Sequence, residues 1–415
     1  MRSAPAAARG FFPLDEALAL LPGQFAPRIV EGIVRLGVWM PFERVPEVFA
    51  FFTGVTVSAE TVRRLTEEAG AAQVAVERAA VERLEADPPV APQGPAIQQM
   101  SVDGAMVPLV GGAWAEVKTL AIGAVTRTAT GAVQTTALSY FSRLSDAEQF
   151  TRWARGETER RGTETAGIVC AVGDGAEWLQ HFVDQHRPDA VRILDFPHAA
   201  QRVCAAAQAV WGAGTAATST WLDDQLHCLK HGDPTVVLAA LRALPVAEAP
   251  SPVEAALTRD TVVAYLTTRW EQIQYARFRA LGYPIGSGIV ESGNKLVVEG
   301  RLKGSGMHWA RANVTPMVAL RAMACSERWA EAWPTIWQAW RARRQADRVQ
   351  QAAAHRAKRT APVAAVPTRP PLPAPAPASP VPRPRLVVDG RPTANHPWRK
   401  RLLPSRPATT MPANP

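Results

Sequence analysis

Three acidic residues, Asp103, Asp174 and Glu291, stand where a sheet could bring carboxylates together. Asp103 is predicted to end a strand in the run SVDG, and Asp174 ends a short apolar run in VGDG. Glu291 is predicted one turn into a helix that begins near Ser287. Carboxylates that meet over a sheet edge repel one another and take raised pKa values unless a cation compensates.

Magnesium is the cation that prefers such oxygen ligands, and manganese is its usual substitute. Two ions about 3.5–4 Å apart stabilise both the attacking and the leaving oxygen of a phosphoryl displacement. The pattern therefore predicts strand cutting that needs no serine, cysteine or histidine nucleophile. Each acid also has an ordinary explanation, because Asp-Gly is a common turn dipeptide and Glu291 could pair with Lys295 one helical turn on.

The elements around the first two acids read as a mixed sheet. Apolar alternation and glycine-containing turns predict an antiparallel meander of three strands, at Met100–Val102, Val117–Val125 and Ala132–Phe141. Two short apolar runs follow, Ile168–Val172 and Ala190–Leu194, around a helix near Trp178–His186. Such runs are typical of strands buried on both faces, which predicts a parallel β-α-β unit. This order is that of a ribonuclease-H-like sheet, an α/β fold.

A helix is predicted between the meander and the parallel unit, over Ser145–Arg160. Ser145 is the expected N-cap, and Glu148 would complete a capping box.

Residues 28–90 are predicted to be helical, within a candidate DNA-binding region that spans 28–95. Within them Phe42–Phe52, the break at Thr53–Val57 and Ser58–Gly70 read as helix, turn, helix, with Ser58 as N-cap. Arg63 and Arg64 would point outward, where a DNA-reading helix contacts its target. An ordinary helical hairpin explains the same pattern.

The remaining segments complete a domain plan. Residues 1–27 form an N-terminal segment, 96–203 the first part of the sheet domain, and 204–285 an alanine-rich, all-helical insertion. Residues 286–340 supply the C-terminal helices of the sheet domain, and 341–415 are predicted to be a disordered, proline-rich tail.

Charge is distributed unevenly along the chain. The net charge is +9, but 341–415 carries fifteen Lys or Arg against two acids, so residues 1–340 are net acidic. DNA contacts in the body must therefore come from local patches, while the tail would add sequence-independent affinity. The four cysteines form no C-x-x-C pair and no long apolar run suggests a membrane span, which predicts a cytoplasmic protein.

Six ordered motifs resemble the bacterial insertion-sequence transposases of the ISKra type, which are similar to the wider Mutator-like DDE group. The motifs are SVDGAMVPL from 101, WAEVKTLAIGAV from 114, VGDGAEWL from 172, ILDFPHAAQRV from 193, GYPIGSGIVESGNKLV from 282 and RLKGSGMHW from 301. The resemblance implies a transposase that binds the terminal inverted repeats of its element and target DNA, needs magnesium or manganese, and works as a homo-oligomer on DNA.

Carried over by position, the family's catalytic and metal-binding acids fall on Asp103, Asp174 and Glu291, and its Asp-x-x-His element on Asp195 and His198. A polar pair that caps the next helix is the alternative reading of Asp195 and His198. Basic and aromatic residues after Glu291 are candidates for DNA contacts, with a solvated helix face and a core tryptophan as the alternative: Lys295, Arg301, Lys303, His308, Trp309 and Arg311.

Two features depart from the family. Its members carry a cysteine-paired, zinc-binding segment ahead of the sequence that resembles Gly10–Leu20, and no cysteine precedes it here, which predicts a shortened N-terminus. The basic tail has no counterpart in the family either. Two other functions therefore stay open: a decayed DNA-binding copy that acts as a repressor, and a ribonuclease-H-like nuclease that cuts without joining.

Overall fold

A computed structural model describes residues 25–360, 387–388 and 391–392. Most of the N-terminal segment and the tail beyond Thr360, including the predicted shortened end, lie outside the described residues. Among the residues described, no helix is long and apolar enough to cross a membrane.

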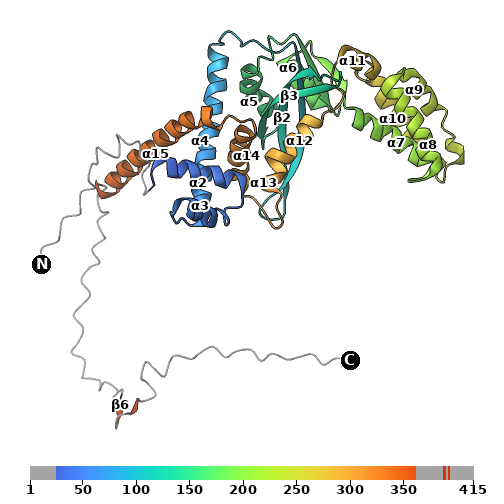
Figure 1. Ribbon diagram of the computed structural model, residues 1–415. Helices are drawn as coiled ribbons and strands as arrows, with labels where there is room; N and C mark the ends of the chain where they lie inside the picture. The colour runs from blue at the N-terminus through green and yellow to red at the C-terminus, as the bar shows by residue number, and fades with distance from the viewer. Residues whose placement is uncertain (1–24, 361–386, 389–390, 393–415) are drawn as a thin grey trace, which may run out of the picture. The chain divides into compact units, whose positions relative to one another are not determined.

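A five-stranded open sheet lies at the centre of the α/β fold, in the order β3-β2-β1-β4-β5 (Figure 1). The strands are β1 (Ile97–Pro108), β2 (Trp114–Arg127), β3 (Val133–Arg143), β4 (Ile168–Gly173) and β5 (Val191–Leu194). The first three are antiparallel, and β4 and β5 run parallel to β1. The predicted meander and parallel unit are confirmed, although β1 is much longer than predicted because β2 pairs with it throughout.

Helices cover both faces of the sheet. On one face, α5 (Ala147–Arg160) and α6 (Glu177–His186) pack their apolar sides on Met100, Leu120 and Ile122. On the other, residues of α12 (Gly288–Gly293), the π-helical η3 (Asn294–Glu299), α13 (Gly300–Leu302) and α14 (Arg311–Cys325) pack on Ala105, Val107 and Val117. Asp146, not the predicted Ser145, caps α5, since its carboxylate accepts from Gln149 N at 2.8 Å.

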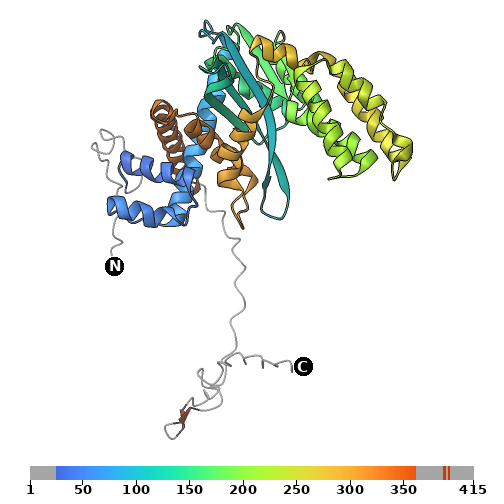
Figure 2. The ribbon, with the colours of Figure 1, turned by 45° about the vertical axis from the view of Figure 1, so that its right-hand side comes forward.

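The helical insertion begins directly after β5 and not at the predicted residue 204, because α7 runs unbroken across that boundary. It contains α7 (Phe196–Trp211), α8 (Ala216–His231), α9 (Pro234–Arg242), η1 (Val246–Glu248), α10 (Pro252–Thr268), η2 (Trp270–Gln272) and α11 (Tyr275–Leu281). These helices share one hydrophobic core with Val172, Ile193 and Leu194 of the sheet edge. Both ribbon views show α7 to α10 extending away from the sheet (Figures 1 and 2).

A second helical group forms its own core. It comprises α2 (Pro27–Trp39), α3 (Val45–Thr53), α4 (Ala59–Ala86) and α15 (Trp329–Thr360), and α14 joins it through Leu320. Ser58 caps α4 as predicted by accepting from Thr61 N at 3.1 Å. The predicted start of the tail at residue 341 was wrong, because α15 continues without a break to Thr360. The repeated tryptophans in the first half of α15 form its buried side, and the charged residues that follow continue the same helix.

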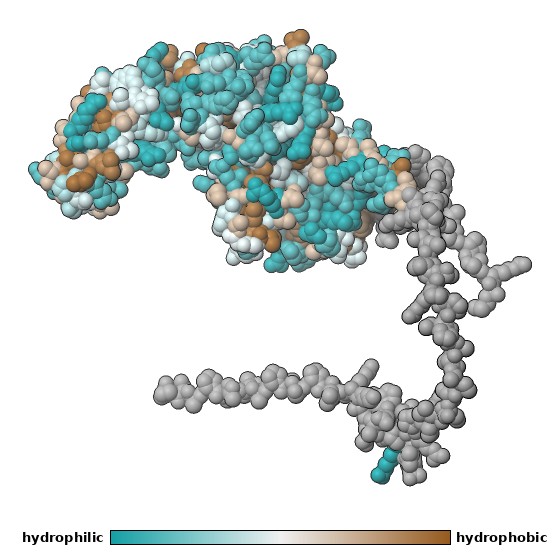
Figure 3. Space-filling view, turned by 180° about the vertical axis from the view of Figure 1, so that it is seen from behind, coloured by the Kyte–Doolittle hydropathy of each residue, from teal (hydrophilic) through white to brown (hydrophobic). Residues whose placement is uncertain are grey.

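Viewed from behind, one face is mostly hydrophilic, with separate hydrophobic patches (Figure 3). Phe51 and Phe52 at the end of α3 are 83% and 77% exposed. Beyond Thr360, the described residues form only the two-residue strands β6 (Val387–Val388) and β7 (Arg391–Pro392), which pair antiparallel.

Candidate active site

Asp103 lies within β1 and not at its end, so that part of the prediction was wrong. Strand alternation places its side chain on the face of Ala105 and Val107, which α12, η3 and α14 cover. There Asn294 Nδ2 donates a hydrogen bond to Asp103 Oδ2 at 2.9 Å. The carboxylate is thus half-buried and held on one oxygen.

Asp174 follows β4 at the same level as Asp103. The last paired residues of β1 and β4 are Met100 and Ala171. Asp103 lies three residues after Met100, and Asp174 lies three residues after Ala171. The Asp174 side chain is exposed, and its Oδ1 accepts from Ala176 N at 2.9 Å. Parallel register therefore brings the two aspartates together where the strands separate, as the sequence predicted for strand-end acids.

Glu291 comes from α12, which packs on β1 and β2. This approach needs Gly293, since a Cβ there would lie 2.7 Å from the ring of Tyr140. The glutamate is exposed, and Ser287 Oγ donates to its Oε1 at 3.3 Å. It forms no ion pair with Lys295 or with any other residue that the structure describes.

The charges of the other two acids act on Asp103. Burial is the main cause that raises the pKa of Asp103, and the negative charges of Asp174 and Glu291 raise it further. The Gly104 amide and Asn294 act in the opposite direction by hydrogen bonding the charged form. A carboxyl group that lies near other carboxylates, with no cation between them, is expected to have its pKa raised in this way.

The carboxylates do not enclose a metal position by themselves. Within the described ranges, no three His, Cys, Asp or Glu side chains lie close enough together to hold an ion. The donors nevertheless match magnesium, which takes few carboxylates and completes its shell with water and phosphate oxygens. The oxygen donors of Asp103, Asp174 and Glu291 are thus of the kind that magnesium prefers, although the three side chains do not converge on one position.

Asp195 connects two parts of the site. Its Oδ2 accepts from His198 N at 3.1 Å and so caps α7, while its Oδ1 accepts from Ser287 N at 2.7 Å, just ahead of α12. The side chain is only 5% exposed. The cap reading is thus confirmed for Asp195, and the same carboxylate also anchors the segment that carries Glu291. His198 is half-buried, with its ring 6.4 Å from that of Tyr265.

The basic candidates after Glu291 divide into exposed and buried residues. Lys295, His308 and Arg311 are exposed and make no ion pair among the described residues. Lys303 is exposed but pairs with Glu299 at 2.7 Å. These four side chains are accessible to a phosphate.

Arg301 and Trp309 are not accessible. Arg301 is 3% exposed, donates from Nε to Gly37 O at 3.2 Å, and lies over the rings of Phe42 and Trp309 at 4.5 and 5.1 Å. Trp309 is 7% exposed, and its backbone extends the end of β1 through bonds with Pro108 and Val110. Their placement corresponds to the core alternative and not to a DNA contact.

The two arginines of α4 already have partners. Arg63 pairs with Glu60 and Glu67 at 2.6 and 3.0 Å, and Arg64 pairs with Glu68 at 3.3 Å. A DNA phosphate would have to compete with these carboxylates of the same helix.

Sequence reasoning missed Asn294, Ser287 and Tyr265. Asn294 and Ser287 stand in the recognised run GYPIGSGIVESGNKLV, whose density of small and polar residues around Glu291 was an available signal. Tyr265 OH donates to Asp174 O at 2.6 Å across 91 positions, and nothing in its helical surroundings marks it.

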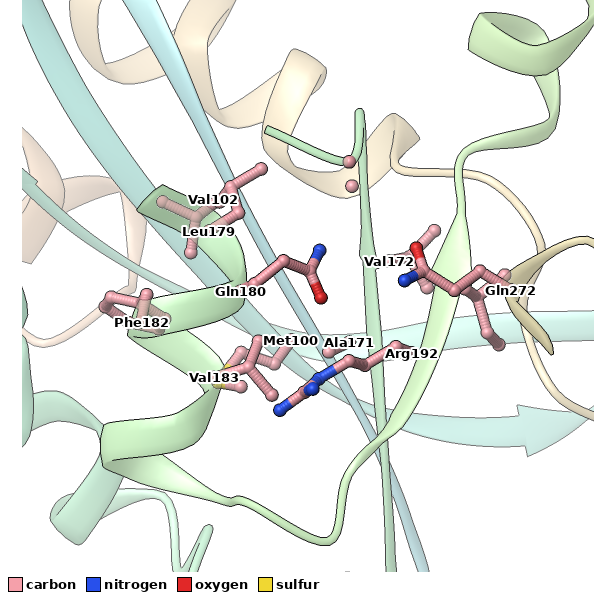
Figure 4. A pocket seen from close by; sticks show the side chains of 13 residues that line it. Met100, Val102, Ala171, Val172, Leu179, Gln180, Phe182, Val183, Arg192 and Gln272 are labelled. Atoms are coloured by element: carbon pink, nitrogen blue, oxygen red, sulfur yellow. The ribbon is translucent and has the colours of Figure 1, made fainter. Parts of the chain in front are cut away.

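A cavity of about 20 Å³ lies beside the Asp174 loop (Asp174–Ala176), lined by Gly175 and by residues of β1, β4, β5, α6 and η2 (Figure 4). Gln180, Arg192 and Gln272 provide its polar side chains. The volume accommodates about one water molecule. A nucleotide is too large to enter it.

No protein-family model matches this chain, and no curated protein matches it either.

Proposed function

We propose that this chain is a DDE-type DNA transposase that binds the terminal inverted repeats of an insertion sequence, cuts their strands and joins them to target DNA. The observation that carries the proposal is the meeting of Asp103 with Asp174 at one level of two parallel strands, with Glu291 close enough to raise the pKa of Asp103. The six motifs that resemble ISKra-type transposases support it.

The proposed fold is ribonuclease-H-like. The order β3-β2-β1-β4-β5, with an antiparallel meander followed by two parallel strands, supports this assignment. In this proposal α3 and α4 form the helix-turn-helix unit that reads the repeats, and the protein acts as a homo-oligomer that pairs two ends.

Asp103, Asp174 and Glu291 would hold one or two ions of magnesium or manganese. When bound, the metal supplies activation of the attacking oxygen and stabilisation of the leaving one. The protein's own part is positional. Asn294 holds Asp103, Ser287 holds Glu291, and Asp195 ties the Ser287 segment to the end of β5.

The test is a nicking assay on duplex DNA that contains the sequences on either side of the gene. We expect cutting at the element ends that requires magnesium or manganese, and a loss of about 10²-fold or more in Asp103→Asn, because a lost metal ligand removes several kcal/mol of transition-state stabilisation. Asp233→Asn is the matched control, since Asp233 caps α9 in the insertion. Metal-dependent cutting that survives Asp103→Asn contradicts the assignment of the site.

A second assay separates transfer from hydrolysis. Pre-cleaved ends with a free 3′-hydroxyl should become joined to target DNA. Cutting without joining would indicate a nuclease, and repeat binding without cutting in either metal would indicate a non-catalytic DNA-binding protein.

A further inference from the structure

The helical insertion reaches the Asp174 loop through one tyrosine. Tyr265 of α10 donates from its hydroxyl to the Asp174 carbonyl oxygen at 2.6 Å. The ring is half-buried. An element outside the sheet thus contacts the backbone of a candidate catalytic acid directly.

Two arginines lie on this tyrosine. The guanidinium carbon of Arg269 is 3.9 Å from the ring centroid of Tyr265, and that of Arg202 is 5.0 Å away. Stacking on an aromatic face orients a guanidinium while leaving its N–H edge available for hydrogen bonds. Arg202 comes from α7 and Arg269 follows α10, so packing between these two helices brings the cations together.

Arg269 also fixes the loop itself. Its Nη2 donates to Gly175 O at 2.7 Å. Gly175 has a φ of +80°, and a Cβ on it would lie 2.5 Å from Arg269 Nε and 3.1 Å from Tyr265 OH. The arginine and the tyrosine therefore close over a position that only glycine fits.

The charge of this cluster is unbalanced. Within the part of the chain that the structure describes, neither Arg202 nor Arg269 forms an ion pair, and Arg202 is exposed. The nearby acids Asp103, Asp174 and Glu291 would repel a DNA strand, and the two arginines supply attraction at the same loop. Guanidinium groups bind phosphate oxygens with paired N–H donors.

We propose that Arg202, held on the ring of Tyr265 beside Arg269, forms a binding site for a backbone phosphate of the DNA strand that lies across the Asp174 loop. This inference rests on the proposed function and names the residues of the insertion that hold the substrate. Arg202 contacts the phosphate, while Arg269 and Tyr265 position both the phosphate and the loop.

The experiment measures the binding of a labelled, mixed-sequence DNA duplex in magnesium buffer as salt is raised. Each phosphate contact contributes about 0.9 to the slope of log K against log salt. Arg202→Gln should lower that slope by about 0.9 and weaken binding roughly tenfold at low salt. Arg242→Gln is the matched control, because Arg242 is an exposed arginine at the end of α9 and lacks an ion pair among described residues.

Two conservative variants test the positioning role. Tyr265→Phe removes the hydroxyl bond to Asp174 but keeps the ring, and Arg269→Lys keeps the charge but loses the paired donors. Both should retain most of the affinity while the cutting rate falls, a split between binding and turnover that a general folding defect would not give.

The outcomes separate the two proposals. Equal slopes and affinities for Arg202→Gln and Arg242→Gln overturn the phosphate site, whether or not the wild-type protein cuts DNA. A reduced slope with no cutting by the wild-type protein supports the phosphate site and contradicts the transposase. A wild-type protein that binds no DNA overturns both.

Discussion

Asp195 accepts the backbone N–H of Ser287 at 2.7 Å, which ties the end of β5 to the start of the helix that carries Glu291 across 92 positions of sequence. The same carboxylate caps α7, the first helix of the insertion. One buried side chain thereby sets the position of a candidate catalytic glutamate and the direction in which the insertion leaves the sheet.

Asp195→Ala should therefore reduce both stability and cutting. Loss of an N-cap costs about 0.5–2 kcal/mol, and a buried N–H left without a partner costs about 1–3 kcal/mol more. Displacement of Glu291 by about 1 Å would slow cutting by roughly 10²-fold. Chemical denaturation and the nicking assay measure the two effects.

Asp233→Ala provides the comparison, because it removes a cap from α9 without touching the Glu291 segment. It should leave the cutting rate unchanged. Equal cutting by the Asp195→Ala and wild-type proteins would refute the anchoring role.

The sequence was enough to predict the strand order of the sheet and the placement of Asp103 and Asp174 on two neighbouring strands. Apolar runs and glycine-containing turns are local signals of strands, and the parallel register of β1 and β4 then places the two aspartates at one level. It was insufficient for the length of β1, because Asp103-Gly104 looks like a turn until β2 is seen to pair with it. Strand length depends here on a partner that local pattern does not reveal.

Contacts between distant segments could not be predicted from the sequence either. Tyr265 and Arg269 reach the Asp174 loop only because α7 and α10 fold back on the sheet edge. Likewise, the motif RLKGSGMHW suggested a surface cation at Arg301, but Phe42 from a distant part of the chain packs on it together with Trp309 of the same motif. Burial of a long charged side chain is decided by its neighbours and not by its own pattern.

Asp103→Asn should raise thermal stability at neutral pH. Burial and the charges of Asp174 and Glu291 raise the pKa of Asp103 above its ordinary 3.8, so the charged form is less stable in the folded protein than in the unfolded one. In the wild-type protein this loss of stability is absent below the pKa that Asp103 has in the unfolded chain. It develops as pH rises through the higher pKa that Asp103 has in the folded protein. The difference in Tm between variant and wild type should accordingly vanish in acid and be full at pH 7.

Magnesium should reduce the destabilisation that the charged carboxylate of Asp103 causes in the folded protein. A cation bound at the site stabilises the folded wild-type protein in proportion to its occupancy, whereas Asp103→Asn should show a much smaller rise in Tm. Equal rises in the two proteins would place any bound metal elsewhere.

Gly175→Ala should disrupt the Asp174 loop. The substitution forces a left-handed alanine, at a cost of about 1–2 kcal/mol, and drives a methyl group into Arg269. Gly111→Ala is a matched control, since Gly111 has a φ of +90° and open space around its Cβ position. Only Gly175→Ala should lose cutting, and similar cutting by both variants would show that the loop tolerates displacement.

Arg301→Gln should destabilise the protein without altering how it holds DNA. Burial lowers the pKa of Arg301 to about 10, so the side chain still carries its charge at neutral pH between Phe42 and Trp309. Its removal leaves the Gly37 carbonyl without that donor and should cost about 1–3 kcal/mol. Lys303→Gln should behave in the opposite way, with stability within about 0.5 kcal/mol of wild type and a salt slope of DNA binding reduced by about 0.9. A reduced slope in Arg301→Gln, with unfolding unchanged, would mean that the segment around Trp309 opens on DNA and exposes this arginine to phosphate.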